Sequence, residues 1–463
     1  MINLRPYQNE IISSLRTKIK KGAKHLIMCA PTGAGKTIMF SYMIKGAVSK
    51  GLKCLILTDR TELLTQSGGA LNNFGLDFSE IKPTNKPTVL NGNLYIAMAQ
   101  TLSRRIKQEL YVEWFDNLDL IIIDEAHKQT FNNLIEYVNK NTIVIGATAT
   151  PLRDKNQKSL HNFYQTLTDE VSVLDLINLG YLSAPKTFGV SVDLSNVKTK
   201  GMDYDTTSMG NMYDESKMYD GVYQNYMRLT PNKKALIFAS SVKSSKKIVS
   251  ELINKGLPAK HIDGNTPKKE RKEVLEWFVN TKDAMLSNVG ILNAGFDCPS
   301  IEVVILYRAT KSLPLFLQMV GRGSRTTETK KEFNILDFGN NIKTHGHWQE
   351  ERAWSLIKKK KREGIAPIKE CSKCKSIVLA QAKECNYCGF VFPINKKEIE
   401  KINLINLKFK AKFDKIIEKQ KLNGYKSSWI FHQLKTKKDF ELYAEYKNYK
   451  KGWVYTQKNK WQK

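Results

Sequence analysis

Long apolar runs are absent from this 463-residue chain. No segment approaches the roughly 20 consecutive apolar residues that a helix needs to cross a bilayer, so we expect no membrane partner. Cysteines are scarce, with seven in all, an odd number. The N-terminal sequence MINLRPYQNEII lacks the charged and then apolar residues of a secretory signal. Both features argue against a disulfide scaffold, and we expect a cytoplasmic protein.

Acidic residues are also few: 45 Asp and Glu stand against 74 Lys and Arg, for a formal net charge of +29. From Lys396 to the C-terminus, 19 lysines and 7 acidic residues give +12, which leaves +17 for the first 395 residues. Lysine-rich usage alone can raise net charge without function, but it does not concentrate the charge in one segment. The distribution favours a polyanionic partner.

The residues that are present predict a nucleotide site near the N-terminus. HLIMCAPTGAGKTIMFSYMI is a short apolar run, a Gly-rich turn and a helical pattern. Backbone N–H groups of such a turn bind phosphates, with Lys36 on the β/γ oxygens and the Thr37 hydroxyl on Mg²⁺. Ala30 stands where the usual GxxxxGKS/T pattern has its first glycine. We expect a strand, a phosphate loop and a helix.

A second apolar run, residues 118–123 of LDLIIIDEAHK, ends in Asp124 and Glu125. At the carboxyl end of a parallel strand, one acid can hold Mg²⁺ through water while the next orients the attacking water. TIVIGATATP is a further apolar strand that ends in small hydroxyl residues. These runs predict a first parallel sheet with both acids at one edge.

A polar stretch over residues 190–226 has the character of an inter-lobe segment. Apolar runs then resume in KKALIFASSV, HIDGNT and IEVVILYRAT, which predict a second parallel sheet. VGILNAGFDCP sets a glycine and an aspartate beside one strand. In QMVGRGSR, Arg322 and Arg325 are three residues apart, so on a helix they would share one face and point at one γ-phosphate.

Taken in order, these segments resemble the motifs of superfamily 2 helicases. APTGAGKT, DEAH and ATATP resemble motifs I, II and III, and LRPYQ resembles the adenine-recognising segment. LTDRTELLTQ and IAMAQTL resemble motifs Ia and Ib, VGILNAGFDCP resembles motif V, and QMVGRGSR fits QxxGRxxR of motif VI. Val289 and Asn293 stand where motif V often has a hydroxyl residue, so no hydroxyl contact is carried over.

The resemblance implies an α/β fold of two RecA-like lobes, with ATP and Mg²⁺ as cofactors. The residues that it implies are, for ATP and Mg²⁺, Gln8, Pro31, Thr32, Gly33, Ala34, Gly35, Lys36, Thr37, Asp124, Gly295 and Asp297; for catalysis, Lys36, Glu125, Gln318, Arg322 and Arg325; for coupling, His127, Thr148 and Thr150; and for nucleic acid, Arg60, Gln100, Thr101 and Ser240.

Four of the seven cysteines form two CxxC pairs, Cys371/Cys374 and Cys385/Cys388, with ten residues between the pairs. Pairs this close suit one tetrahedral zinc site, although redox-active thiols are an alternative. Four thiolates leave no position for a reacting water, so we expect Zn²⁺ to act as a structural clamp. The other cysteines, Cys29, Cys54 and Cys298, lie in or beside apolar runs and are expected in the core.

The basic tail contains a weak repeat with an offset of 24 residues: GYKSSWIFHQ and NYKKGWVYTQ. Each copy has Tyr and Trp four apart, which places both on one face if the segment is helical. Aromatics interleaved with lysines suit base stacking and phosphate contact, which would make Trp429 and Trp453 nucleic-acid contacts. The alternative is that the tryptophans form the core of a small helical module, and both can hold.

A second resemblance covers the C-terminal half. DFGNN, a His-Gly pair, a four-cysteine knuckle and a GYK..W tail after such a core are similar to RadD-type DNA repair helicases and related phage helicases. The expected domains are residues 1–189 (first lobe, ATP-binding), 190–226 (inter-lobe segment), 227–357 (second lobe), 358–395 (basic run and zinc knuckle) and 396–463 (Lys/aromatic nucleic-acid-binding tail).

The resemblance implies an ATP-dependent DNA helicase or translocase in repair, recombination or replication. Single-stranded, forked or branched DNA is the expected partner, with recombination or single-strand-binding proteins as further partners. The location would be the bacterial cytoplasm, or the host cytoplasm if the chain is phage-encoded. The alternatives are an RNA helicase, a duplex or branched-DNA translocase, a restriction-type motor, and a binding module whose ATPase has decayed; the intact motifs argue against the last.

Overall fold

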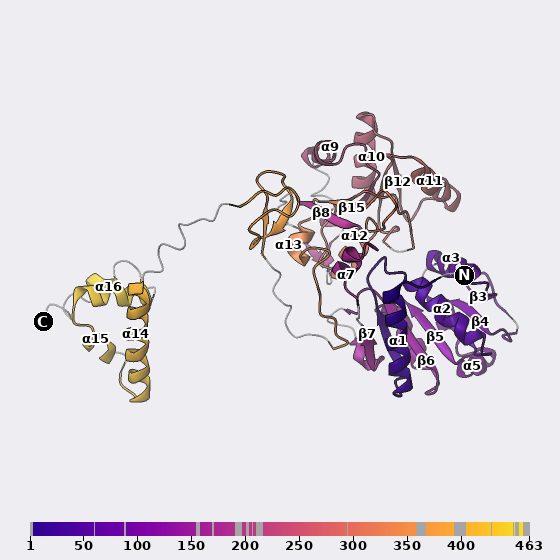
Figure 1. Ribbon diagram of the computed structural model, residues 1–463, viewed down its shortest axis with the longest axis horizontal. Coiled ribbons are helices and arrows are strands. Elements are labelled where there is room, and N and C mark those ends of the chain that lie inside the picture. Colours follow the sequence, from indigo (N-terminus) through magenta and orange to yellow (C-terminus); the bar gives the residue numbers. More distant parts are fainter. Residues whose placement is uncertain are drawn as a thin grey trace. The chain divides into compact units, whose positions relative to one another are not determined.

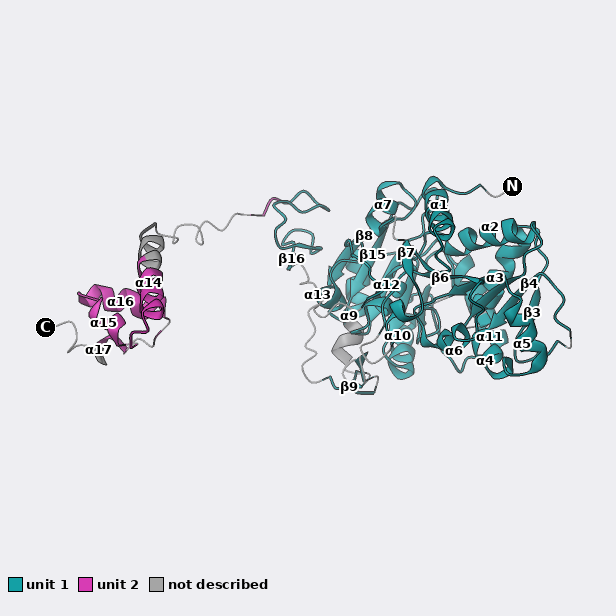
Figure 2. Ribbon diagram, turned by 90° about the horizontal axis from the view of Figure 1, so that it is seen from below, with its two compact units in different colours: residues 1–390 teal, residues 391–463 magenta. Residues whose placement is uncertain are grey.

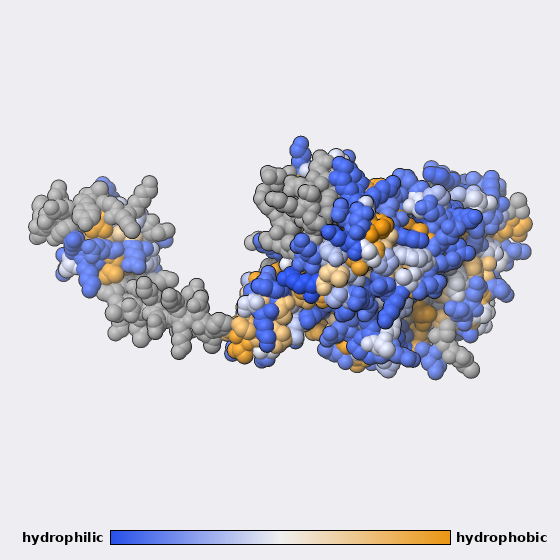
Figure 3. Space-filling model, turned by 90° about the horizontal axis from the view of Figure 1, so that it is seen from above, coloured by the Kyte–Doolittle hydropathy of each residue, from blue (hydrophilic) through white to orange (hydrophobic). Residues whose placement is uncertain are grey.

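The computed structural model divides into two compact units, residues 1–390 and 391–463 (Figures 1 and 2). It describes residues 3–59, 61–87, 89–153, 158–168, 171–189, 197–200, 203–205, 207–209, 216–293, 295–357, 367–392, 404–426, 428–447, 449 and 453–456. Among these, no helix is long and apolar enough to cross a membrane. On the face in Figure 3, hydrophilic residues predominate over the larger unit.

The first lobe is built on a seven-stranded sheet of order β3-β4-β2-β5-β6-β1-β7, and its ladders are parallel. Strands β2 and β5 are buried along their whole length, as expected where helices cover both faces of a parallel sheet. The strands are β1 (His25–Cys29), β2 (Cys54–Thr58), β3 (Ser79–Ile81), β4 (Leu94–Met98), β5 (Leu120–Asp124), β6 (Ile143–Thr148) and β7 (Thr166–Thr168).

Two apolar layers flank this sheet, because alternate residues of a strand point to opposite faces. Leu26 and Met28 pack with α1, α2 and α3, whereas Ile27 packs with α4, α5 and α6. The helices of this lobe and of the segment that follows it are α1 (Pro6–Lys20), α2 (Lys36–Val48), α3 (Thr61–Asn73), α4 (Ala99–Arg105), α5 (Glu109–Asp116), α6 (Asn132–Ile135) and α7 (Val173–Asn178).

The second lobe has a six-stranded parallel sheet of order β12-β13-β11-β14-β15-β8. Its strands are β8 (Ala184–Gly189), β11 (Ala235–Ala239), β12 (Ala259–Ile262), β13 (Met285–Asn288), β14 (Val303–Tyr307) and β15 (Glu332–Asp337). Its helices are α9 (Ser216–Leu229), α10 (Val242–Asn254), α11 (Lys268–Asn280), α12 (Leu313–Val320) and α13 (Asn341–His345). The expected fold of two parallel-sheet lobes is confirmed.

The expected boundary between the lobes differs from the division of the strands between the two sheets. Strand β8 falls within residues 1–189, yet it forms the edge of the second sheet beside β15. The expected inter-lobe segment also belongs largely to the second lobe: Val222 and Tyr226 of α9 are buried against it. A hairpin of β9 (Thr199–Lys200) and β10 (Asp203–Tyr204) lies in the same segment. An edge strand needs fewer apolar residues than a central one, and APKTFG has no continuous apolar run. Its sequence therefore did not indicate a strand.

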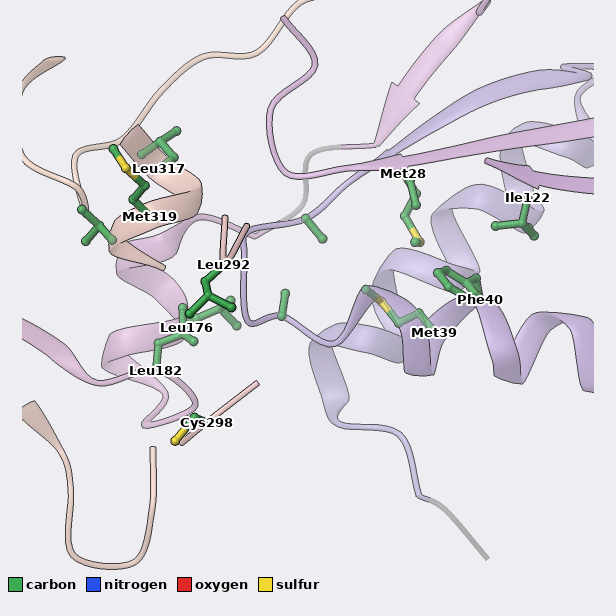
Figure 4. Packing of buried hydrophobic residues seen from close by; sticks show 14 of the residues in the cluster. Met28, Met39, Phe40, Ile122, Leu176, Leu182, Leu292, Cys298, Leu317 and Met319 are labelled. Carbon is green, nitrogen blue, oxygen red and sulfur yellow. The ribbon is translucent and has the colours of Figure 1, made fainter. Parts of the chain in front are cut away.

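Two features join the lobes. One apolar cluster contains members from both, including Met28 and Phe40 of the first and Leu317 and Met319 of the second (Figure 4). After α13, the chain also returns to the first lobe. The carbonyl of Leu356 accepts hydrogen bonds from Ser159 Oγ (2.7 Å) and the His161 N–H (3.2 Å).

The four-cysteine segment docks on the second lobe rather than standing apart. It contains the hairpin β16 (Ile368–Glu370) and β17 (Ile377–Leu379). Ser376 forms a β-bridge with Phe188 of edge strand β8, and Tyr387 donates its hydroxyl to the Pro185 carbonyl at 3.1 Å. The segment thereby covers part of an otherwise open sheet edge.

The second unit is a small helical module with its own core. Its helices are α14 (Leu404–Leu422), α15 (Trp429–His432), α16 (Lys437–Tyr446) and α17 (Trp453–Thr456). The most buried apolar side chains include Phe413, Leu434 and Phe440. Trp429 and Trp453 are partly buried against this core, as the core interpretation of the repeat expects.

Candidate active site

The phosphate loop lies between the end of β1 and the start of α2, as the sequence predicted. Gly33 and Gly35 have φ of +97° and +79°, which side chains with a Cβ rarely adopt. The Lys36 ammonium donates to the carbonyls of Ala30 (3.1 Å) and Pro31 (3.3 Å) within the loop. Burial lowers the pKa of Lys36. The loop therefore has the curvature and the buried cation that a polyphosphate requires.

The LRPYQ segment begins α1 and lies against this loop. Gln8 accepts from the Arg5 N–H at 3.0 Å and donates through Nε2 to the Ala34 carbonyl at 3.0 Å. Tyr7 donates its hydroxyl to the same carbonyl at 2.8 Å. The ring of Tyr181 lies 5.2 Å from that of Tyr7 and under the Arg5 guanidinium at 4.5 Å. Neither Tyr7 nor Tyr181 was expected at this site from the sequence. The position of Tyr7 next to Gln8 is a signal that could have indicated Tyr7, whereas Tyr181 has no such signal.

The two acids stand where β5 ends. Glu125 adopts φ of +53°, an uncommon conformation for a residue other than glycine and one that occurs at functional sites. Burial raises the pKa of Asp124 to about 7, and the charge of Glu125 adds to this shift. Burial also acts to raise the pKa of Glu125, but His127, Lys36 and Lys128 outweigh it and the pKa is lowered.

A hydrogen-bonded chain connects the acids with the end of β6. His127 Nδ1 lies 2.8 Å from Thr148 Oγ1 and 3.4 Å from Glu125 Oε2. Thr148 Oγ1 also accepts from the Thr150 N–H at 3.1 Å. Burial lowers the pKa of His127, which favours the neutral ring. All three residues expected to couple the nucleotide site to the next strand are thus brought together.

The second lobe reaches the same site through the segment that follows α12. Gln318 Nε2 donates to Glu125 Oε2 at 3.3 Å, which joins residues 193 positions apart. A Cβ added to Gly321 would lie 2.8 Å from Thr32 Cβ, and one added to Gly33 would lie 3.3 Å from Arg325 Nη1. Both lobes therefore contribute to one site, with glycines at the points of closest approach.

The expectation that Arg322 and Arg325 share a helical face is wrong. Helix α12 ends at Val320 with Gly321 as its C-cap, and the arginines lie in the turn after it. Arg322 donates through Nη1 to the Phe296 carbonyl (2.6 Å) and through Nη2 to the Asn293 carbonyl (2.7 Å).

The motif V residues lie beside these arginines. Asp297 accepts from Arg325 Nε at 3.1 Å. Gly295 has φ of +76°, which explains a glycine at this position. The pairing of Asp297 with Arg325 places this aspartate beside a guanidinium that lies next to the phosphate loop.

The residues expected to bind nucleic acid are less uniform. Gln100 is exposed on α4, whereas Thr101 is buried. Ser240 is buried and its hydroxyl lies 3.1 Å from that of Ser244 in α10, whose N-cap is the neighbouring Ser241. Arg60 lies outside the described residues. Of the three described residues in this set, Gln100 alone has an exposed side chain.

Two polar residues of the second lobe that were not expected from the sequence hold nearby backbone: Lys330 holds the arginine segment, and Asn341 holds the turn after β14. Lys330 donates to the carbonyls of Ile301 (2.7 Å) and Gly323 (2.8 Å), and burial lowers its pKa to about 8. Asn341, in the DFGNN segment, donates to the Arg308 carbonyl at 2.8 Å and accepts from the Thr310 N–H at 3.0 Å. No local pattern identifies Lys330 among so many lysines.

The four cysteines of the docked segment meet in space. Their Sγ atoms all lie within 4.8 Å of one another, with Cys371–Cys388 and Cys374–Cys385 at 3.7 Å. Burial acts to raise the pKa of Cys385, but the Ser376 hydroxyl and neighbouring backbone N–H groups lower it to about 6. Gly389 has φ of +67°, consistent with the expected tight turn. The cluster has the composition of a tetrahedral sulfur site.

Comparison with known proteins places these segments in two families. Residues 1–153 match the family described as "Type III restriction enzyme, res subunit", and residues 219–327 match "Helicase conserved C-terminal domain". A "51.5 kDa protein" of a Lactococcus phage is 29% identical over 425 residues, which are 88% of each chain. The "Putative ATP-dependent helicase IRC3" of Saccharomyces cerevisiae is 27% identical over 72% of this chain; the chain spans about half (51%) of that relative.

Solved structures share the fold at low identity. The ATP-dependent Type ISP restriction-modification enzyme LlaBIII, bound to DNA, matches with a TM-score of 0.57 and 22% identity over 73% of this chain and 28% of its own. A fragment of a putative HsdR subunit of a type I restriction enzyme from Vibrio vulnificus matches with a TM-score of 0.59 and 22% identity over 74% of this chain and 65% of its own. Two helicase-family segments in order, on this two-lobed fold, establish that the chain belongs to the superfamily 2 helicases, a family of nucleic-acid-dependent ATPases.

Proposed function

We propose that this chain is an ATP-driven DNA motor of the RadD type, which moves on or remodels DNA in repair, recombination or replication. The hydrogen bond from Gln318 to Glu125 carries the proposal, because it unites the two lobes at the carboxylate best placed to act on water. A site divided in this way assembles only when the lobes are together. Nucleotide turnover can therefore drive their relative movement.

In this proposal, the residues of the first lobe bind the nucleotide. The Lys36 ammonium exchanges the carbonyls of Ala30 and Pro31 for phosphate oxygens, and Gln8 recognises the adenine edge. Thr37 and Asp124 would hold Mg²⁺, which supplies charge neutralisation at the β- and γ-phosphates. The buried, oxygen-rich edge of β5 fits such an ion, because carboxylate and hydroxyl oxygens are its preferred ligands.

The remaining residues act on the attacking water and on developing charge. Glu125 orients the water, and Gln318 holds the carboxylate at the lobe interface. Arg325 already lies beside the phosphate loop, where its charge would stabilise the transition state. The chain from His127 through Thr148 to Thr150 would transmit the state of the site toward the strand bound across the lobes.

DNA is favoured over RNA by the restriction-enzyme relatives, although RNA helicases also occur among the relatives. The endonuclease subunit of the type I restriction enzyme EcoAI of Escherichia coli is 24% identical over 381 residues. RNA helicases are also similar, among them the probable ATP-dependent RNA helicase DDX10 of Gallus gallus, 25% identical over 341 residues. A restriction-type translocase with little strand separation is the second candidate, supported by the two restriction-enzyme folds.

We also propose that the four cysteines bind one Zn²⁺ as a structural clamp. Few apolar side chains of this segment are buried apart from Val378, so metal ligation would supply most of its cohesion. The segment itself is held on β8 through Tyr387 and Ser376.

One experiment separates these functions: steady-state ATPase activity measured side by side with single-stranded DNA, duplex DNA, forked DNA and RNA of equal length. A DNA motor is stimulated most by single-stranded or forked DNA, and an unwinding assay on the fork should then show strand separation. Strongest stimulation by duplex DNA without unwinding would support the restriction-type translocase. Strongest stimulation by RNA would contradict the proposal.

A further inference from the structure

The repeat in the tail has a structural basis that centres on its tyrosines. Helix α14 ends in a Schellman motif: the Tyr425 N–H donates to the Gln420 carbonyl (3.0 Å) and the Gly424 N–H to the Lys421 carbonyl (3.2 Å). Gly424 has φ of +63°, the left-handed conformation that this cap requires. The backbone of Tyr425 is therefore fixed to the end of a helix.

Tyr449 occupies the same position after α16. Its N–H donates to the Ala444 carbonyl at 2.8 Å, again five residues back. In sequence, Asn448 precedes Tyr449 as Gly424 precedes Tyr425. In each copy, a tyrosine whose N–H is bound to the end of a helix is followed by a short helix that begins at the tryptophan.

Each tyrosine ring is backed by the tryptophan four residues later. The ring centroids of Tyr425 and Trp429 are 4.8 Å apart with an interplanar angle of 30°, and those of Tyr449 and Trp453 are 4.6 Å apart at 39°. Both tyrosines are 42% exposed, whereas both tryptophans are partly buried. The tryptophans serve as supports, and the tyrosines are the rings presented to solvent.

The surroundings of these rings are basic. The unit that contains them, residues 391–463, has 19 lysines, no arginine and 7 acidic residues. Three carboxylates among its described residues are already engaged: Asp439 with Lys412 at 2.9 Å, Glu441 with Lys437 at 3.7 Å, and Asp414 with the hydroxyl of Tyr446. Exposed lysines flank the two caps: Lys419, Lys421, Lys426 and Lys447. Positive charge beside a supported aromatic ring is complementary to a nucleotide, which offers a phosphate and a flat base together.

We propose that Tyr425 and Tyr449 are two equivalent stacking surfaces for the bases of single-stranded nucleic acid, with the neighbouring lysines on its phosphates. The inference deepens the proposed function and rests on it. The proposal also moves the expected nucleic-acid contact from the tryptophans to the tyrosines. The ring of Trp453 has the rings of Phe431, Phe440 and Tyr443 within 6.3 Å, in addition to that of Tyr449. Tyr449 is therefore the ring of this copy that a base can reach. Because each tyrosine ring already packs on a tryptophan, little side-chain entropy is lost on stacking.

The test uses the full chain and two fluorescent 12-mers, oligo(dT) and an abasic analogue with the same number of phosphates. The double variant Y425L/Y449L removes both rings but keeps apolar volume, and Y425F/Y449F keeps the rings. Tyr137→Leu is the matched control, since Tyr137 is 46% exposed in the first lobe. Binding is measured by anisotropy at one fixed salt concentration, because salt changes the phosphate contribution.

The leucine variant should bind oligo(dT) at least fivefold more weakly than the parent, because stacking on one aromatic contributes about 1–3 kcal/mol per base. It should bind the abasic strand as the parent does, which also shows that the module is folded. The phenylalanine variant and Tyr137→Leu should match the parent on both strands. Unchanged oligo(dT) binding by the leucine variant, or an equal loss on both strands, would overturn the proposal.

Failure of the stacking proposal and failure of the motor proposal give different results. If DNA stimulates the ATPase of the parent but the leucine variant binds oligo(dT) normally, only the stacking surfaces are wrong, and the rings are free to contact a protein partner instead. If neither DNA nor RNA stimulates the parent, the proposed motor function fails. A parent that does not bind oligo(dT) overturns the stacking proposal directly.

Discussion

Replacing Glu125 with glutamine should nearly abolish ATP turnover while leaving the fold and nucleotide binding intact. The two side chains have almost the same volume, and the φ of +53° is equally costly for both. The amide oxygen of glutamine can still accept the hydrogen bond that Gln318 donates at 3.3 Å. What is lost is the carboxylate charge that would orient water and take its proton.

The expected magnitude follows from that loss. General base catalysis typically contributes about 10²–10⁴-fold, so kcat should fall by at least about 100-fold, or roughly 2.7 kcal/mol or more in activation free energy. The free energy of unfolding should change by only about 1 kcal/mol, because a hydrogen bond to a charged group becomes one to a neutral group. Binding of an ATP analogue should stay within a few-fold of the parent.

The assay is DNA-stimulated ATPase at saturating ATP, with fluorescent-nucleotide binding and urea unfolding measured on the same preparations. Glu136→Gln is the control, since Glu136 is 59% exposed in the same lobe and its one ion pair, with Lys158, is at the surface. Turnover close to that of the parent would refute the role of Glu125. An equal loss of nucleotide binding and of turnover would place this carboxylate in binding rather than in catalysis.

Three further predictions concern other parts of the chain. Cys371→Ser should remove about one zinc per chain, measured by elemental analysis, and loosen residues 367–392 toward proteolysis; an unchanged zinc content would contradict the site. Ending the chain after Pro393 should weaken DNA binding and lower the slope of log K against log salt by about 0.7 per lost phosphate contact, while basal ATPase falls less; equal losses would mean that the tail is structural. Thr148→Val should lower the free energy of unfolding by about 1–3 kcal/mol, measured in urea against the exposed Thr17→Val, because it strips the buried His127 and the Thr150 N–H of a partner; identical unfolding of the two variants would exclude this role.

Much of the fold was predictable because its signals are local. A fully buried strand needs a continuous apolar run, and a phosphate loop needs glycines where φ is positive, so β1, β2, β5 and β14 could be located from their residues alone. Edge strand β8 was missed because an edge needs fewer apolar residues, and its sequence therefore looks like a linker. The helix expected through Arg322 and Arg325 was wrong because spacing alone does not reveal where a helix ends.

The sequence by itself therefore determined the lobes, the nucleotide motifs and the four-cysteine cluster, since each depends on short stretches with a fixed chemical pattern. Only the tertiary structure decided which side chains meet. It brings Gln318 to Glu125 across 193 positions, docks the cysteine segment on β8, and turns Trp429 and Trp453 inward so that Tyr425 and Tyr449 face solvent. The physical reason is that contact and exposure depend on packing between distant segments, which residue spacing along one segment does not encode.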